Sequence, residues 1–256
     1  MVKKRDKKAQ VTIFIILAIV IVALGILIYM FYPQISSSLG LGAQSPNAFI
    51  QSCLQDKLKE SIDILSPQGG SLNPEFYYLY QGEKIKYLCY TAEDYERCIV
   101  QEPMLKQSIE AEVKQNITQD VKQCFDQLES NFKAKGYQVS LKREAFAVEL
   151  LPKRVIALFN YTLALKKGDE IETYKQFSVI LNNNLYELVS IANSIVSFET
   201  TIGAVETSAY MNYYHDLKVE KKKQSDGTTI YILTDRNTNE RFQFASRSVV
   251  WPPGYG

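Results

Sequence analysis

One uncharged apolar run near the N-terminus constrains this chain more than any other feature of its sequence. Residues 11–32, VTIFIILAIVIVALGILIYMFY, contain no charged side chain, and Thr12 is the only clearly polar one. As a helix, the run is about 33 Å long, which is enough to cross a hydrocarbon core of roughly 30 Å. The sequence therefore predicts a transmembrane helix over residues 11–32.

Basic residues flank this run on one side only. Five basic residues precede the run, and Asp6 is the only acidic residue there. After the run, no Lys or Arg occurs until Lys57. Positive residues stay on the cytoplasmic side of a membrane. We therefore expect residues 1–10 to be a basic cytoplasmic leader and the protein to be a single-pass protein of the cell membrane. Residues 33–45 are expected to be a flexible stalk, and the C-terminal domain to lie outside.

The charge of the exported part excludes one class of partner. The net charge of +1 combines this basic leader with a remainder in which acidic residues slightly outnumber basic ones. A protein that binds the phosphate backbone needs an excess of Lys and Arg. We therefore expect no nucleic acid as a partner, and the lipid bilayer as one partner.

Helical periodicity predicts two long helices in the exported part. Apolar residues recur at helical spacing over residues 46–65 and again over residues 103–135. Between them, two aromatic runs around a Gln-Gly-Glu turn predict a β-hairpin over residues 76–90. Residues 46–135 are thus expected to form a helix–hairpin–helix region.

The rest of the chain changes to the alternation that is typical of strands. Residues 136–248 predict an antiparallel sheet, with one helix over residues 184–212 that begins at a capping box of Asn184 and Glu187. Residues 249–256 read as a tail. The expected fold class is α+β: one N-terminal transmembrane helix followed by an extracytoplasmic domain with long helices packed on an antiparallel sheet.

Four cysteines lie within the helix–hairpin–helix region. An even number of cysteines in an exported region indicates two disulfides, whereas free thiols or a zinc site are the alternatives. If the two long helices pack antiparallel, Cys53 lies near Cys124, and Cys89 and Cys98 close the loop between the helices. The other two pairings stay open at this stage.

The chain shows no catalytic motif. It has no G-x-S-x-G, no H-E-x-x-H, no phosphate loop and no dinucleotide fingerprint. Its one histidine, His215, follows two tyrosines at the predicted end of the last helix, where a structural role is the more common one. We therefore expect no enzyme activity, no cofactor and no metal.

Tyrosine is abundant, and it suits both contact surfaces and ordinary strands. The chain has 17 tyrosines. Two clusters stand out, and they are Tyr77, Tyr78, Tyr80, Tyr87, Tyr90 and Tyr95 around the first hairpin, and Tyr210, Tyr213 and Tyr214 beside His215. Two N-glycosylation sequons begin at Asn116 and Asn160, of which Asn116 is the better candidate.

The N-terminus resembles a known export signal. Lys7-Lys8-Ala9-Gln10, followed by the apolar run, is similar to the archaeal class III (prepilin-type) signal, in which a membrane peptidase cuts before the apolar segment. The resemblance implies cleavage between Ala9 and Gln10, although Phe14 stands where many pilins have Glu. A permanent signal anchor is the alternative.

The chain as a whole resembles a group of single-pass surface proteins of small-celled archaea, through the stretches AQVTIFI, SCL, QGG and FQFASR. This resemblance implies a class and no activity. We expect a membrane-anchored extracytoplasmic structural or adhesion protein, pilin-like if the leader is cleaved, with other surface or membrane proteins or its own copies as partners. The alternative is a tethered enzyme or solute-binding module, for which a deep polar pocket with perturbed carboxylates would be evidence.

Overall fold

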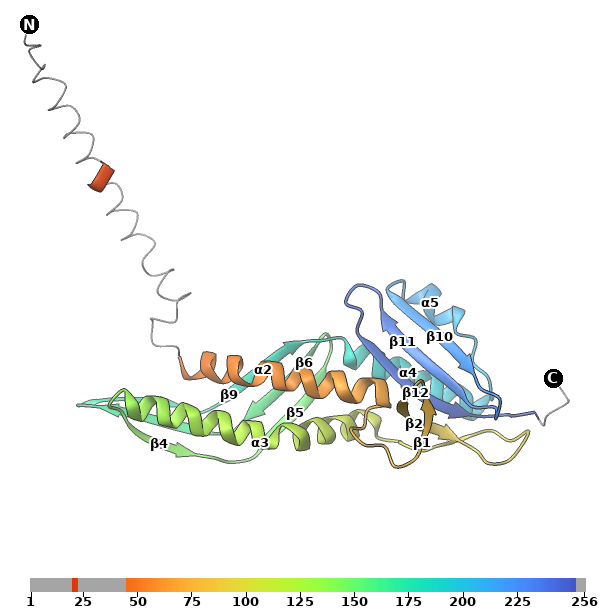
Figure 1. Ribbon diagram of the computed structural model, residues 1–256, viewed down its shortest axis with the longest axis horizontal. Coiled ribbons are helices and arrows are strands. Elements are labelled where there is room, and N and C mark those ends of the chain that lie inside the picture. Colours follow the sequence, from red (N-terminus) through yellow and green to blue (C-terminus); the bar gives the residue numbers. More distant parts are fainter. Residues whose placement is uncertain (1–19, 23–44, 252–256) are drawn as a thin grey trace, which may run out of the picture. The chain divides into compact units, whose positions relative to one another are not determined.

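The structure is a computed structural model that describes residues 20–22 and 45–251 (Figure 1). The chain divides into two compact units, Met1–Ala48 and Phe49–Gly256. In the first unit, residues 20–22 are helical, and the backbone N–H of Ala48 donates to Ser45 Oγ at 3.3 Å. This contact makes Ser45 the N-cap of the next helix.

Two long helices, α2 (Pro46–Leu65) and α3 (Leu105–Ala134), match the two that helical periodicity predicts. They run antiparallel and lie side by side (Figure 1). A disulfide between Cys53 of α2 and Cys124 of α3 joins them. Each helix buries one apolar stripe, which on α2 consists of Ile50, Leu54, Leu58, Ile62 and Leu65.

Two small antiparallel sheets follow, and α3 contacts one strand of each, β4 and β5. Their orders are β4-β7-β8 and β5-β6-β9. The six strands are β4 (Gln138–Lys142), β5 (Phe146–Leu151), β6 (Arg154–Phe159), β7 (Thr162–Lys167), β8 (Glu170–Tyr174) and β9 (Phe177–Asn182). Successive strands such as β6 and β7 belong to different sheets, so this part of the chain forms two sheets where one antiparallel sheet was predicted.

The third sheet combines the first hairpin with the C-terminal strands. Its order is β1-β2-β12-β11-β10, with the short β3 paired to β2. Strand β2 pairs with β12 in parallel, and the other neighbours are antiparallel. The strands are β1 (Tyr77–Tyr80), β2 (Glu83–Tyr90), β3 (Ile99–Val100), β10 (Leu217–Lys223), β11 (Thr229–Asp235) and β12 (Arg241–Arg247).

The expected fold class is wrong in two respects. The domain is α+β, but its strands form three sheets with one parallel pairing, where a single antiparallel sheet was expected. In the described part of the chain, no helix combines the length and apolar character that a membrane crossing requires. Of the predicted span 11–32, all but residues 20–22 lie outside the described residues.

The single helix predicted over residues 184–212 is two helices. Helix α4 (Leu185–Thr201) and the short helix α5 (Ser208–Tyr213) are separated at Gly203, whose φ is +92°. A helix cannot continue through a left-handed residue, so the chain turns there. The turn places α5 against β10.

The N-terminus of α4 is capped differently from the prediction. The side chain of Asn184 makes no capping hydrogen bond to the helix. Instead, Asn183 Oδ1 accepts a hydrogen bond from Leu185 N–H at 2.9 Å, and the carboxylate of Glu240 accepts one from Asn184 N–H at 2.8 Å. Glu187, the predicted partner in the capping box, accepts from Lys153 N–H at 2.9 Å. The carboxylate of Glu240, from the turn between β11 and β12, therefore replaces the expected local cap.

Candidate functional site

An aromatic groove between α4 and α5 is the most ligand-like surface among the described residues. The buried face of α4 consists of apolar residues such as Leu188 and Ile195, together with Glu199. Its outer face carries residues spaced four apart, which places them in one line along the helix. They are Tyr186, Ser190, Ser194 and Phe198.

Helix α5 supplies the second wall of this groove. Tyr210, Tyr213 and Tyr214 project from α5 and from the residue that follows it. The rings of Tyr213 and Tyr214 meet edge to face, with 4.7 Å between their centroids. Tyr210 Oη and Ser194 Oγ are 2.7 Å apart and form a hydrogen bond between the two walls.

The groove contains two neighbouring hollows. The first has a volume of about 280 Å³ and is lined by Tyr186, Glu187, Ser190, Ile191, Ser194, Tyr210 and Tyr214. The second has a volume of about 340 Å³ and is lined by Ser194, Phe198, Val205, Glu206, Ala209, Tyr210, Tyr213 and Tyr214. Ser194, Tyr210 and Tyr214 belong to both, so the Ser194–Tyr210 hydrogen bond marks the ridge between them.

Large apolar side chains are exposed along this groove. Tyr213 is 78% exposed, Tyr214 48% and Phe198 46%. Exposed aromatic residues that gather in one place mark interaction sites more often than scattered ones do. The arrangement offers ring faces and hydroxyl groups, and it therefore suits binding more than covalent chemistry.

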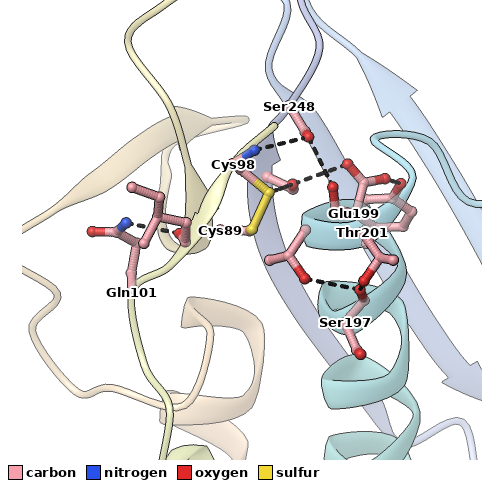
Figure 2. The surroundings of a disulfide bond; sticks show 11 residues. Cys89, Cys98, Gln101, Ser197, Glu199, Thr201 and Ser248 are labelled. Atoms are coloured by element: carbon pink, nitrogen blue, oxygen red, sulfur yellow. Dashed lines mark hydrogen bonds between the residues drawn. A yellow bond between two sulfur atoms is a disulfide. The ribbon is translucent and has the colours of Figure 1, made fainter. Parts of the chain in front are cut away.

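A buried carboxylate beside the Cys89–Cys98 disulfide is the second candidate site (Figure 2). Glu199, in the last turn of α4, is only 4% exposed. Tyr231 donates a hydrogen bond to its Oε1, and Ser246 Oγ donates to its Oε2 at 3.3 Å. Each carboxylate oxygen is therefore already occupied by a partner from the central strands of the third sheet.

Ser248 links this carboxylate residue to the disulfide. Its Oγ donates to the backbone carbonyl of Glu199 at 3.1 Å and accepts from Cys98 N–H at 3.1 Å (Figure 2). A cavity of about 490 Å³ lies beside Glu199, and its lining includes Lys221 and Trp251. The cavity is thus polar and partly walled by the C-terminal segment.

Burial raises the pKa of Glu199, although the hydrogen bonds from Tyr231 and Ser246 and the charge of Lys221 oppose the shift. Burial also raises the pKa of Tyr231, and the neighbouring Glu199 carboxylate raises it further. Tyr231 therefore stays a neutral donor, and Glu199 holds its proton to a higher pH than an exposed Glu.

We expect the variant Glu199→Gln to gain stability relative to the natural protein as the pH rises. The folded protein binds the Glu199 proton more tightly than the unfolded chain does. The free energy of unfolding therefore falls as the pH rises from the usual 4.5 through the raised pKa. Gln cannot titrate, so the variant avoids this loss, which is about 1.4 kcal/mol for each pKa unit. Urea unfolding between pH 3 and pH 8 measures the difference.

Glu220→Gln is the control with the opposite sign. Hydrogen bonds from Lys218 and Lys222 lower the pKa of Glu220. The natural residue therefore adds stability as the pH rises toward 4.5, and its removal makes the variant relatively less stable over that interval. If the two variants change in the same direction with pH, the assigned environment of Glu199 is incorrect.

The C-terminal residues described here pack against the domain. Val249 and Val250 lie over Gly203 and Gly227, where a Cβ on either glycine would come within 2.1 and 2.3 Å of a valine methyl. Val249 N–H donates to Glu96 O at 2.8 Å. Val249 has a φ of +46°, which is strained for a β-branched residue. Residues 249–251 of the predicted tail are thus held in place.

The structure places the sequence-predicted cysteines in two disulfides, so the disulfide prediction is confirmed. The pairs are Cys53–Cys124 and Cys89–Cys98. They are the pairs that the antiparallel packing of the two long helices implies. Cys53 and Cys124 lie on the two predicted helices and Cys89 on the predicted hairpin, whereas Cys98 lies in the loop before β3.

The other predicted site residues have separate places. Asn116 is exposed on α3, and Asn160 is exposed in the break between β6 and β7. His215 is exposed and follows Tyr214. Ala9 and Gln10 lie outside the described residues, so cleavage between them stays a prediction.

The two tyrosine clusters have different roles. Around the first hairpin, Tyr87 is buried in a small second core of the third sheet, and Tyr78, Tyr80 and Tyr90 pack against that core. The cluster beside His215 instead lines the groove. Sequence reasoning missed Tyr186 and Phe198, although their spacing with Ser190 and Ser194 on one helical face was a signal.

Comparisons with protein-family models, with curated proteins and with solved structures give no match for this chain. The geometry of the groove and of the Glu199 site therefore carries the functional argument.

Proposed function

We propose that this protein is an extracytoplasmic interaction or structural protein that binds its partners through the groove between α4 and α5. The exposed aromatic lining of the groove carries this proposal. Four tyrosines and Phe198 surround two hollows, and the groove floor contains buried apolar residues such as Ile191 and Val205. An exposed aromatic surface over an apolar floor gains free energy when a partner removes it from water.

The proposed location is the outer surface of the cell membrane, with the N-terminal apolar segment as the attachment. Two disulfides support an oxidising compartment. The five basic residues before the apolar segment support export of the C-terminal part. In the filament form of the proposal, cleavage between Ala9 and Gln10 lets copies of the chain assemble.

The cavity beside Glu199 favours the alternative function, a tethered enzyme or solute-binding module. A buried carboxylate with a raised pKa is typical of such sites. However, Tyr231 and Ser246 already occupy its two oxygens, and the side chain is almost fully buried. The same contacts connect α4 to β11 and β12, which is the role of a structural group. We therefore prefer the groove.

Photo-crosslinking from the groove tests the proposed function. Tyr213→benzoylphenylalanine keeps an aromatic ring at the most exposed position of the groove, so the fold is expected to be unchanged. Illumination of cells that display the variant is expected to give a covalent adduct larger than the chain. The control is the variant Gln115→benzoylphenylalanine, at an exposed position on α3. Equal adduct formation at both positions, or none at Tyr213, would contradict the proposal.

A further inference from the structure

We propose that the groove between α4 and α5 binds an extended, proline-rich segment that carries a basic residue. This inference rests on the proposed function, because it names the class of partner that the groove recognises. Aromatic-lined grooves recognise such segments because a polyproline II helix is already ordered before binding and presents its side chains and carbonyl groups outward.

The spacing of the two hollows matches this kind of ligand. On α4, the lining of the first hollow runs from Tyr186 to Ser194, with Ser190 in the middle, and the lining of the second consists of Ser194 and Phe198. The centres are therefore about six helical residues apart, or about 9 Å. In a polyproline II helix, residues three apart lie on the same side at a spacing of about 9 Å. Two such residues would fill the two hollows at once and straddle the Ser194–Tyr210 ridge.

The hydroxyl groups of the groove match the free carbonyl groups of such a ligand. Tyr186, Tyr213 and Tyr214 line the groove, and in the described part of the chain none of their hydroxyls has a hydrogen-bond partner. Polyproline II carbonyls have no internal partners, so they can accept from these hydroxyls. An α-helical ligand has its backbone groups paired within itself and would leave the tyrosine hydroxyls without partners.

The charge of the groove selects a basic residue in the ligand. Glu187 and Glu206 are the charged residues that line the two hollows, and no Lys or Arg lines either one. Glu206 is exposed, and hydrogen bonds from Ser208 lower its pKa, so it is ionised at neutral pH. Glu187 Oε2 is buried without a hydrogen-bond partner in the described part of the chain. A cation at the Glu206 end of the ligand is therefore favoured by charge complementarity.

A peptide titration tests the proposal on the full chain, held in detergent micelles, with both disulfides intact. The probe is the capped peptide Arg-Ala-Leu-Pro-Pro-Leu-Pro-Ala-Gly, and its binding is followed by calorimetry. We expect saturable binding to the natural protein. Replacing all three prolines of the probe by alanine is expected to abolish binding, and replacing its arginine by glutamate is expected to weaken binding about tenfold, the value of one charge-assisted hydrogen bond.

Variants of the protein locate the binding. Tyr214→Ala removes a ring that lines both hollows, and it is expected to weaken binding of the probe at least tenfold. Glu206→Gln keeps the shape of the side chain and is expected to remove the preference for arginine over glutamate. Tyr77→Ala on β1 is the matched control, because it removes an exposed tyrosine outside the groove and should leave binding unchanged.

Three outcomes would overturn the inference. The first is that the probe does not bind, and the second is that the alanine-substituted peptide binds better than the proline-rich one. The third is that Tyr214→Ala and Tyr77→Ala affect binding equally. None of these outcomes decides the proposed function, because crosslinking from Tyr213 reports any partner of the groove. A failed titration with a positive crosslink therefore leaves an interaction protein whose partner is of another class.

Discussion

Replacing Cys53 and Cys124 together by alanine is expected to lower the free energy of unfolding by about 4 kcal/mol. The two residues are 71 positions apart, so the disulfide closes a long loop and removes a large number of conformations from the unfolded chain. The expected value comes from the chain-entropy model for a loop of this length. Urea unfolding of the oxidised proteins, monitored by circular dichroism, measures the loss.

The position of this disulfide explains why α2 depends on it. Cys53 of α2 is bonded to α3, and the Gln51 amide pairs with the backbone of Ile180 in β9, an edge strand of its sheet. Gln51 donates to Ile180 O at 2.9 Å and accepts from Ile180 N–H at 3.0 Å. Without the disulfide, the polar anchor of the first turns is this single side chain. We therefore expect early exchange of amide hydrogens in α2 of the variant.

The pair Cys89 and Cys98 is the matched control for loop length. These residues are 9 positions apart, so the same entropy argument gives about 3 kcal/mol for their replacement by alanine. The long-loop variant should therefore unfold at the lower urea concentration. The reverse order would contradict the entropy argument and would show that contacts of the native state around Cys98 and Ser248 determine the stability.

The long helices and hairpins could be predicted because their signals are local. Apolar residues at helical spacing identify α2 and α3, and a Gly-containing turn between aromatic runs identifies the hairpin of β1 and β2. In these segments the apolar residues that give the sequence its periodicity are also the residues that lie in the core. The antiparallel arrangement of α2 and α3 then brought Cys53 close to Cys124.

The division into three sheets could not be predicted, because it depends on contacts between distant residues. Tyr87 of β2 pairs in parallel with Ala245 of β12, and no local pattern encodes that pairing. Likewise, the break at Asn160 and Tyr161 assigns β6 and β7 to different sheets, although the alternation of apolar residues continues across it. The partner of a strand depends on contacts across the whole domain, whereas apolar periodicity predicts only that a segment is a strand.

The candidate site was only partly visible in the sequence. Composition pointed to Tyr210, Tyr213 and Tyr214, but the break at Gly203 that forms the second wall was missed because Ile202 and Val205 continue the helical apolar spacing. Glu199 lies on the buried stripe of α4, four residues after Ile195. An acidic residue on an apolar stripe is a usable signal for a buried carboxylate, but sequence reasoning missed it, and only the structure shows the hydrogen bonds of Glu199 to Tyr231 and Ser246.

The substitution Gly227→Ala is expected to lower the free energy of unfolding by about 3 kcal/mol and to displace the C-terminal segment. Gly227 has a φ of +86°, where a residue with a Cβ is strained by about 1 kcal/mol. The new Cβ would also lie 2.3 Å from Cγ1 of Val250, so the valine must move. Overpacking of this kind costs about 1–3 kcal/mol beyond the strain.

Trp251 reports the displacement directly. It is the only tryptophan of the chain, and its ring meets that of Tyr95 edge to face with 5.2 Å between the centroids. If Val250 leaves its place over Gly227, the next residue moves with it. The fluorescence anisotropy of Trp251 is therefore expected to fall in the Gly227→Ala variant, under conditions where circular dichroism shows that the domain is folded.

Gly82→Ala separates strain from overpacking. Gly82 has a φ of +89°, close to that of Gly227, but a Cβ there would meet no heavy atom within 4 Å. Its substitution should cost only the backbone strain and leave the Trp251 signal unchanged. Adding Val250→Ala to Gly227→Ala is expected to recover part of the lost stability, because the clashing methyl groups are gone. Equal losses at Gly82 and Gly227, with no change at Trp251, would show that Val250 does not hold the C-terminal segment against the domain.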